Sequence, residues 1–148
     1  MVDFKVLGHS LTRVDALDKV TGQSTYASDV YLPGMLMCKL LVSDRSHAKI
    51  VSIDTSAAER LPGVRYIITG KDFPDIYFGS GALMDRRVMA RDEVFYIGEP
   101  VAAVAADDET IAQEAVELIR VEYQDLDTVV EPLQALEPDA PWVHPDLP

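Results

Sequence analysis

The segment Tyr96–Tyr123 constrains the fold of this 148-residue chain most strongly, because it joins a strand pattern, a helix pattern and a second strand pattern. Gly98 and Pro100 precede the first strand pattern, Val101–Ala106, which contains no polar residue. An unbroken apolar run of this length predicts a strand that is buried on both faces. Other parts of the chain must therefore cover it.

The middle of this segment has the signals of a helix. Asp107 or Asp108 can cap the helix start, and Glu109 places negative charge where the helix dipole favours it. The chain then returns to a sheet at Val121–Tyr123. If this strand and Val101–Ala106 share a sheet and run parallel, their connection is a right-handed crossover. Apolar residues recur on one helix face at Ile111, Ala115 and either Leu118 or Ile119, together with Ala112 and Val116.

Composition and charge exclude several classes of protein. Hydrophobic residues make up 48% of the chain, which is enough for a folded core. The net charge of −12 argues against a nucleic-acid partner, since phosphate binding needs clustered Lys and Arg. The sequence has no apolar run near the roughly 20 residues of a membrane span and no signal-peptide pattern. The single cysteine, Cys38, excludes a disulfide framework and a cysteine-ligated iron–sulfur cluster within this chain, so we expect a cytoplasmic protein.

Three further strands and a short helix are predicted in the first half of the chain. The strand patterns are Met35–Val42, which is nearly unbroken and predicts burial, Ala48–Ile53 and Val64–Thr69. Ser56 and Glu59 fit a capping box, in which the two side chains satisfy backbone donors at a helix start. Strand, short helix and strand therefore occur here as well.

The remaining segments are less regular. Residues 1–30 are polar with scattered apolar anchors, which favours an extended wrap over a surface, with a disordered tail as the alternative. Lys71–Arg87 is rich in both glycine and apolar residues, so it either covers the core or contacts a partner or ligand. Val88–Ala90 and Glu93–Tyr96 are predicted short strands. Residues 137–148 contain four prolines and are typical of a linker.

The sequence contains no self-contained active-site motif. His9, His47 and His144 lack metal-ligand spacing, and a surface hydrogen-bonding role is expected for His47 at a turn. The glycines at Gly79 and Gly81 are not followed by the lysine and hydroxyl of a phosphate-binding loop. No nucleophile elbow occurs either.

Four stretches together resemble the N-terminal α/β-hammerhead domain of the molybdenum-binding subunit in the xanthine dehydrogenase and aldehyde oxidase family. The resemblance covers Gly8 to His144 in order. It rests on Arg13-x-Asp15 with Lys19–Gly22 and Tyr26-x-x-Asp29; Pro33–Leu36 with Ser46–Ile50 and Ile53-Asp54; Leu61–Val64 with Thr69 and Asp72; and Ala90–Val94 with Gly98–Ala102 and the closing Val121–Tyr123.

This resemblance implies an α+β fold of the α/β-hammerhead type, with a mixed β-sheet, two helices and an extended N-terminal wrap. It divides the chain into a wrap at 1–30, a hammerhead domain at 31–136 and a proline-rich linker at 137–148 that leads towards molybdopterin domains. Family members are oxidoreductases that insert water-derived oxygen at a carbon, using molybdenum on a pterin. The proximity of Met1 to the first motif resembles bacterial members, which carry iron–sulfur clusters and FAD on partner subunits.

The resemblance assigns no catalytic, cofactor-binding or metal residue to this chain. It implies that Ala82 and Leu83, with Asp85 retained, line the funnel that leads to molybdenum; core-facing loop residues are the alternative. Their small size disfavours a purine substrate. The sequence therefore predicts a structural and substrate-funnel domain of a molybdenum hydroxylase, which is not catalytic by itself. A free-standing interaction or scaffold module is the alternative, and the apolar loop Tyr77–Met84 makes self-association plausible.

Overall fold

The computed structural model describes residues 6–79 and 84–143, and the chain divides into two units, Met1–Met35 and Leu36–Pro148. The first unit contains the short helix α1 (Ala16–Val20) and the 3₁₀ turn η1 (Ala27–Asp29). The segment expected to be extended therefore includes a helix. No helix among the described residues is both long enough and apolar enough to cross a membrane.

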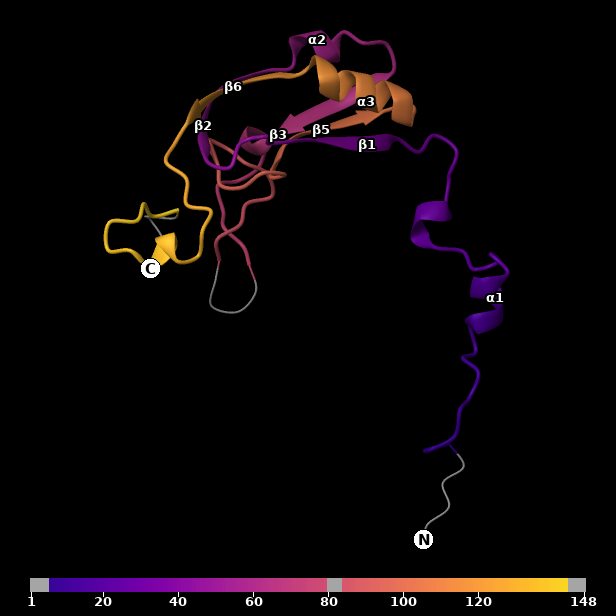
Figure 1. The fold of residues 1–148 in the computed structure, drawn as a ribbon. Helices are drawn as coiled ribbons and strands as arrows, with labels where there is room; N and C mark the ends of the chain where they lie inside the picture. Colours follow the sequence, from indigo (N-terminus) through magenta and orange to yellow (C-terminus); the bar gives the residue numbers. More distant parts are fainter. Residues whose placement is uncertain (1–5, 80–83, 144–148) are drawn as a thin grey trace. The chain divides into compact units, whose positions relative to one another are not determined.

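The first sheet of the second unit is built around β5 (Pro100–Ala106). This strand lies between β1 (Met37–Val42) and β3 (Val64–Thr69), and both pairings are antiparallel. Helix α3 (Glu109–Leu118) lies along one side of this sheet (Figure 1). A central strand with a helix over one of its faces is largely buried, and β5 contains no charged residue.

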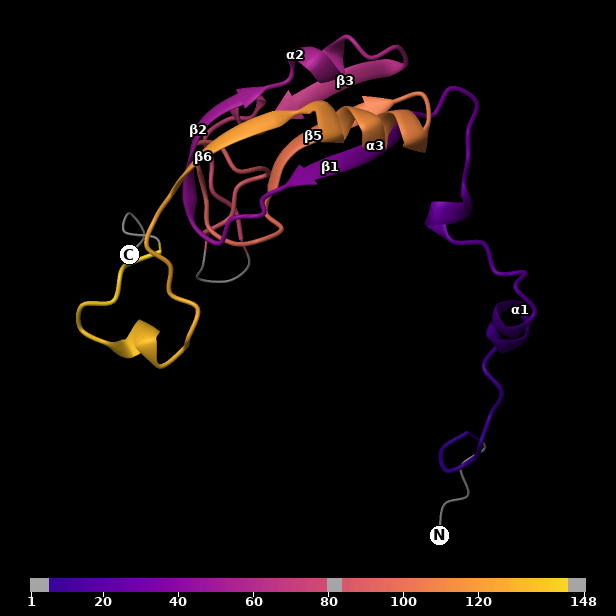
Figure 2. The same cartoon turned by 45° about the horizontal axis from the view of Figure 1, so that its top comes forward.

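The second sheet is built around β2 (Ala48–Asp54). Its neighbours are β4 (Glu93–Val94) and β6 (Arg120–Asp125), again antiparallel. Strands β2 and β6 lie side by side in Figure 2. The short helix α2 (Ser56–Glu59) connects β2 to the first sheet and packs against α3. Two further 3₁₀ turns, η2 (Gly70–Asp72) and η3 (Gln134–Leu136), follow β3 and β6 in the chain.

Two apolar clusters form the core, one for each sheet. The larger cluster lies between α3 and the first sheet, and the smaller one joins β2, β4 and β5. Burial of these side chains is the main stabilising contribution, at about 25 cal/mol per Å² of apolar surface. The buried members are Ala58, Ala102, Val104, Ala115, Val116 and Ile119 in the larger cluster, and Ala48, Ala90, Val94 and Val101 in the smaller one.

The structure confirms the expected α+β class but not the conditional crossover. Strands β5 and β6 flank α3 in sequence, yet they belong to different sheets and do not pair. The same holds for β2 and β3 around α2. The expected mixed sheet is thus divided into two antiparallel sheets. Helix α3 serves as a connection between sheets, so the handedness rule for parallel neighbours does not apply.

Several local predictions also need correction. Thr55, not Ser56, is the N-cap residue of α2, and its hydroxyl donates to Glu59 Oε1 at 2.6 Å. The backbone N–H of Ser56 instead donates to Asp54 Oδ1 at 3.0 Å. The predicted strand at Val88–Ala90 is absent from the described secondary structure. Ala90 N–H donates to the Pro100 carbonyl, but this single hydrogen bond is not part of a strand pairing.

Candidate functional site

The turn between β4 and β5 is fixed to the end of β1 by the backbone. Gly98 N–H donates to the Ser43 carbonyl at 2.8 Å, and Ser43 N–H donates to the Glu99 carbonyl at 2.8 Å. Gly98 has a φ of +93°, which favours glycine over residues with a side chain. This arrangement places residue 99 at the junction of β1, β4 and β5.

The side chain of Glu99 is turned into the protein. The residue is only 8% exposed, and its Oε2 accepts the Phe95 N–H at 2.6 Å. Burial raises the pKa of the Glu99 carboxyl, while hydrogen bonds from the Phe95 and Tyr96 backbone act in the opposite direction. A buried carboxyl with a raised pKa is a feature that proton-transferring sites share with some structural sites.

His47 links three segments next to this carboxyl. Its Nδ1 lies 2.8 Å from the Asp127 carbonyl oxygen, and its Nε2 lies 2.7 Å from Glu93 Oε1. The ring also stacks on Phe95, with centroids 5.8 Å apart. The ring therefore joins the backbone after β6 to a side chain of β4. The expected hydrogen-bonding role of His47 is confirmed, but its side chain is 11% exposed and lies below the surface.

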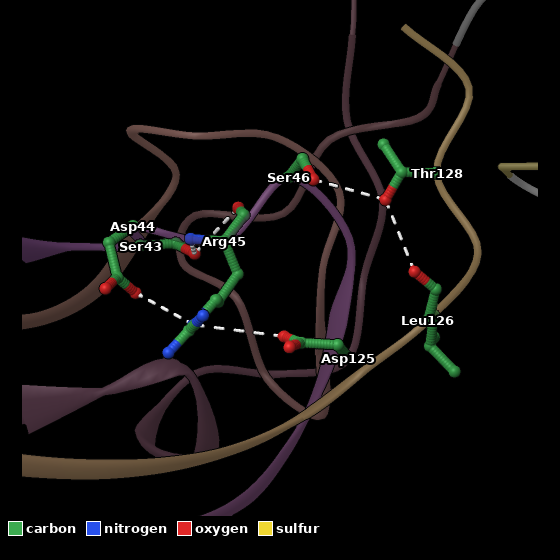
Figure 3. A network of polar contacts seen from close by, with 7 residues as sticks. All are labelled: Ser43, Asp44, Arg45, Ser46, Asp125, Leu126 and Thr128. Carbon is green, nitrogen blue, oxygen red and sulfur yellow. Dashed lines mark hydrogen bonds and ion pairs between the residues drawn. The ribbon is translucent and has the colours of Figure 1, made fainter.

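A polar network extends from Ser43 to the segment after β6 (Figure 3). The Ser43 hydroxyl donates to the Arg45 carbonyl and accepts from Arg45 N–H, at 3.0 and 2.9 Å. The Arg45 guanidinium lies 3.4 Å from Asp44 and 3.8 Å from Asp125. The hydroxyls of Ser46 and Thr128 are 3.1 Å apart. These contacts hold the β1–β2 loop against the chain that leaves β6.

Two cavities are both lined by Phe95, Tyr96 and Val143. The larger, of about 420 Å³, is also lined by the charged residues 85–87 and Glu99. The smaller, of about 270 Å³, is also lined by His47 and residues 128–130. Their sizes suit a small ligand or part of one. The charged groups of the larger cavity and its aromatic wall could hold a polar, planar group, but they form no nucleophile–base pair.

The stem of the adjoining loop is well fixed. Phe78 and Arg86 exchange backbone hydrogen bonds at 2.8 and 3.1 Å, which forms an isolated antiparallel bridge. Arg87 pairs with Asp75 at 2.9 Å and lies 4.3 Å from the Tyr77 ring centroid. The two ends of the loop are therefore held together beside the larger cavity.

The predicted funnel residues Ala82 and Leu83 lie outside the described residues, while Asp85 lines the larger cavity. Sequence reasoning missed the burial of Glu99. The available signal was an acidic residue directly before an apolar strand, where a charged side chain has little access to water. Within 6–79 and 84–143, no group of three or more His, Cys, Asp or Glu residues could hold a metal ion.

Comparison with known proteins places these features in a family context. Residues 21–127 match the family described as aldehyde oxidase and xanthine dehydrogenase, a/b hammerhead domain. The chain is 43% identical over 137 residues to a probable xanthine dehydrogenase subunit from Bacillus subtilis, and the match covers 93% of this chain and 18% of that protein. It is 38% identical over 144 residues to the carbon monoxide dehydrogenase large chain of Afipia carboxidovorans, with coverage of 95% and 18%.

Solved structures give the same result. A carbon monoxide–reduced Cu,Mo-CO dehydrogenase has a TM-score of 0.84 and 38% identity, covering 94% of this chain and 18% of that one. An aldehyde oxidoreductase from Desulfovibrio desulfuricans has a TM-score of 0.87 and 30% identity, covering 97% and 17%. The chain thus spans less than a fifth of the length of these relatives.

Proposed function

This chain belongs to the aldehyde oxidase and xanthine dehydrogenase family, through its a/b hammerhead domain, and we propose that it is a structural and substrate-funnel domain of a molybdenum hydroxylase. One observation carries the proposal: the match runs through 93% of this chain but only 18% of the relative. A segment with that relation to its relatives contributes one domain to a larger enzyme.

The cofactors are proposed to lie outside these 148 residues, with molybdopterin on the molybdopterin-binding domains of the same enzyme. Relatives include molybdenum enzymes, as the Cu,Mo-CO dehydrogenase shows, and this supports molybdopterin in the complete enzyme. The described residues do not fit a resident metal, since they provide no cluster of three or more ligands and Cys38 is the only cysteine. We place molybdopterin beyond the matched segment, and iron–sulfur clusters and FAD on partner subunits. The cytoplasmic location stays a prediction.

The funnel role is supported by the geometry around the loop stem. The Phe78–Arg86 bridge and the Arg87–Asp75 ion pair fix both ends of the loop that carries Ala82 and Leu83. A stem held in this way supports a role in orienting substrate, because orientation requires a fixed attachment to the domain. The domain's role in this proposal is to orient substrate and limit its size, with no bond made or broken on its own side chains.

Metal content and association test the structural role. The 148-residue chain, produced and purified alone, is expected to contain no stoichiometric molybdenum, and to bind the molybdopterin-binding domains of its enzyme when these are supplied separately. Elemental analysis and a tagged pull-down measure both. Stoichiometric molybdenum in the isolated chain, or a chain that never associates with these domains, would overturn the proposal and favour the free-standing module.

Substrate selectivity tests the funnel role. In the assembled enzyme, Ala82→Trp and Leu83→Trp are expected to lower kcat/KM for a bulky aromatic aldehyde at least about tenfold more than for acetaldehyde, because added volume narrows the path. Ile76→Trp is the matched control, since Ile76 is 64% exposed on the same loop region. Equal effects on both aldehydes would show that these residues do not line the path.

A further inference from the structure

The face of the first sheet opposite α3 is apolar and open. Side chains alternate along each strand, so the residues of β1 and β3 that turn away from α3 lie beside two alanines of β5. The exposed fractions are 49% for Leu40, 70% for Tyr66 and 38% for Ile68. None of the residues on this face carries a charge. They are Cys38, Leu40 and Val42 of β1, Ala103 and Ala105 of β5, and Tyr66 and Ile68 of β3. We call this surface the open face.

The second sheet provides an internal comparison. On its outer face the paired residues are Lys49 with Gln124, Ser52 with Glu122, and Asp54 with Arg120. Polar pairs of this kind are typical of an antiparallel sheet face that contacts water. The face of the second sheet that contacts water therefore consists largely of polar residues, whereas the open face of the first sheet has no charged residue. An apolar surface with this composition indicates an interaction site.

The shape of the open face favours a helix. Ala103 and Ala105 form a low floor along β5, between the larger side chains of β1 and β3. The outer strands of a three-stranded sheet are about 9.6 Å apart, close to the roughly 10 Å diameter of a helix. Helix α3 already packs over the opposite face of β5, where Ala102 and Val104 form part of the core (Figure 1).

We propose that a helix of the molybdopterin-binding domains of the same enzyme packs along β5 on the open face, with an apolar stripe towards Ala103 and Ala105. The inference rests on the proposed function. The relatives supply the reason for this occupant, because more than four fifths of their length lies outside the matched segment. A second copy of this chain is disfavoured by charge, since each copy carries −12.

Cys38 provides a direct probe, because it is exposed, lies on the open face and is the only cysteine of the chain. Its alkylation by iodoacetamide is measured by mass spectrometry of the Cys38 peptide, in the isolated chain and in the assembled enzyme. We expect alkylation to be at least about tenfold slower in the assembled enzyme. Equal rates in an enzyme with full molybdenum content would overturn this inference and leave the proposed function intact.

A matched pair of variants tests the same contact by affinity. Leu40→Glu is expected to weaken binding of the 148-residue chain to the separately produced molybdopterin-binding domains at least about tenfold, because it buries a charge in an apolar contact. Val51→Glu introduces the same group in β2, where Val51 is 55% exposed, and should leave Kd within about twofold. Similar Kd values for both variants would contradict the proposal.

Other occupants give different results. If Cys38 is protected in the isolated chain and dilution restores its reactivity, a second copy covers the open face. If deletion of residues 1–35 restores the reactivity of Cys38, the first unit of this chain covers the open face. Either outcome overturns the inference. If the chain forms no complex at all, both the inference and the proposed function fail.

Discussion

Gly70 holds the end of β3 close to the loop before β4, and Gly70→Ala tests how strictly that approach is required. A Cβ atom at this position would lie 2.1 Å from the Ala90 carbonyl oxygen and 2.6 Å from its carbon. Raising the first contact to 3.0 Å, the shortest distance that real Cβ atoms show, needs a displacement of 0.9 Å. Both obstructing atoms are backbone, so no side-chain rotation relieves the clash.

The displacement would spread into the core. Ala90 is 1% exposed, and its N–H donates to the Pro100 carbonyl at 2.8 Å, so moving this segment disturbs the start of β5. Overpacking of this kind costs about 1–3 kcal/mol, and a clash between backbone atoms belongs at the upper end. At 2–4 °C per kcal/mol, about 3 kcal/mol corresponds to a fall in Tm of roughly 6–12 °C. Urea denaturation and thermal unfolding followed by circular dichroism measure both quantities.

Gly98→Ala separates steric clash from backbone strain. Gly98 has a φ of +93° but no atom within 4 Å of a Cβ, so alanine there costs only the left-handed conformation, about 1–2 kcal/mol. Gly70→Ala should therefore be the more destabilising variant. If the two variants lose equal free energy of unfolding, or if Gly70→Ala is neutral, the close approach at Ala90 does not constrain the fold.

Two other perturbations have clear expected results. Asp108→Ala should lower the free energy of unfolding by about 1 kcal/mol, since Asp108 Oδ1 accepts the Ile111 N–H at 2.8 Å as the cap of α3. The control, Glu114→Ala on the exposed face of α3, should change the free energy of unfolding by less than about 0.5 kcal/mol. Equal losses in urea denaturation would show that the cap is not stabilising. Glu99→Gln tests the effect of the raised pKa of the Glu99 carboxyl. The protonated carboxyl stabilises the folded protein fully when the pH is below the ordinary pKa of glutamate, and this stabilisation is lost as the pH rises through the raised pKa. The variant should thus gain stability relative to wild type between about pH 4 and pH 7, and a difference that is constant over this range would contradict the burial of an ionisable Glu99.

The comparisons and the structure separate what local patterns encode from what they do not. The family and its α+β hammerhead fold were identified from the spacing of short motifs, and the matched segment at 21–127 confirms that assignment. The funnel role of Ala82 and Leu83 stays a prediction. The domain limits at 1–30, 31–136 and 137–148 also stay predictions, and the structural division between Met35 and Leu36 is a separate observation.

The sequence by itself determined where the main strands and the long helix lie. Val101–Ala106 is unbroken and apolar, and β5 is the most buried strand; the helical spacing after Asp108 matches α3, with Ala112, Ala115 and Val116 buried. These features depend on periodicity and capping, which are properties of neighbouring residues in the chain.

Only the tertiary structure decided which strands pair and which groups lose contact with water. The alternation in β6 is the same whether it pairs beside β5 or, as observed, beside β2 in a separate sheet. Glu99 becomes buried because Ser43 and Phe95 approach it from β1 and the β4 end, a meeting that no local pattern records. Periodicity fixes the face on which a side chain lies, whereas strand partners and burial depend on residues distant in the chain.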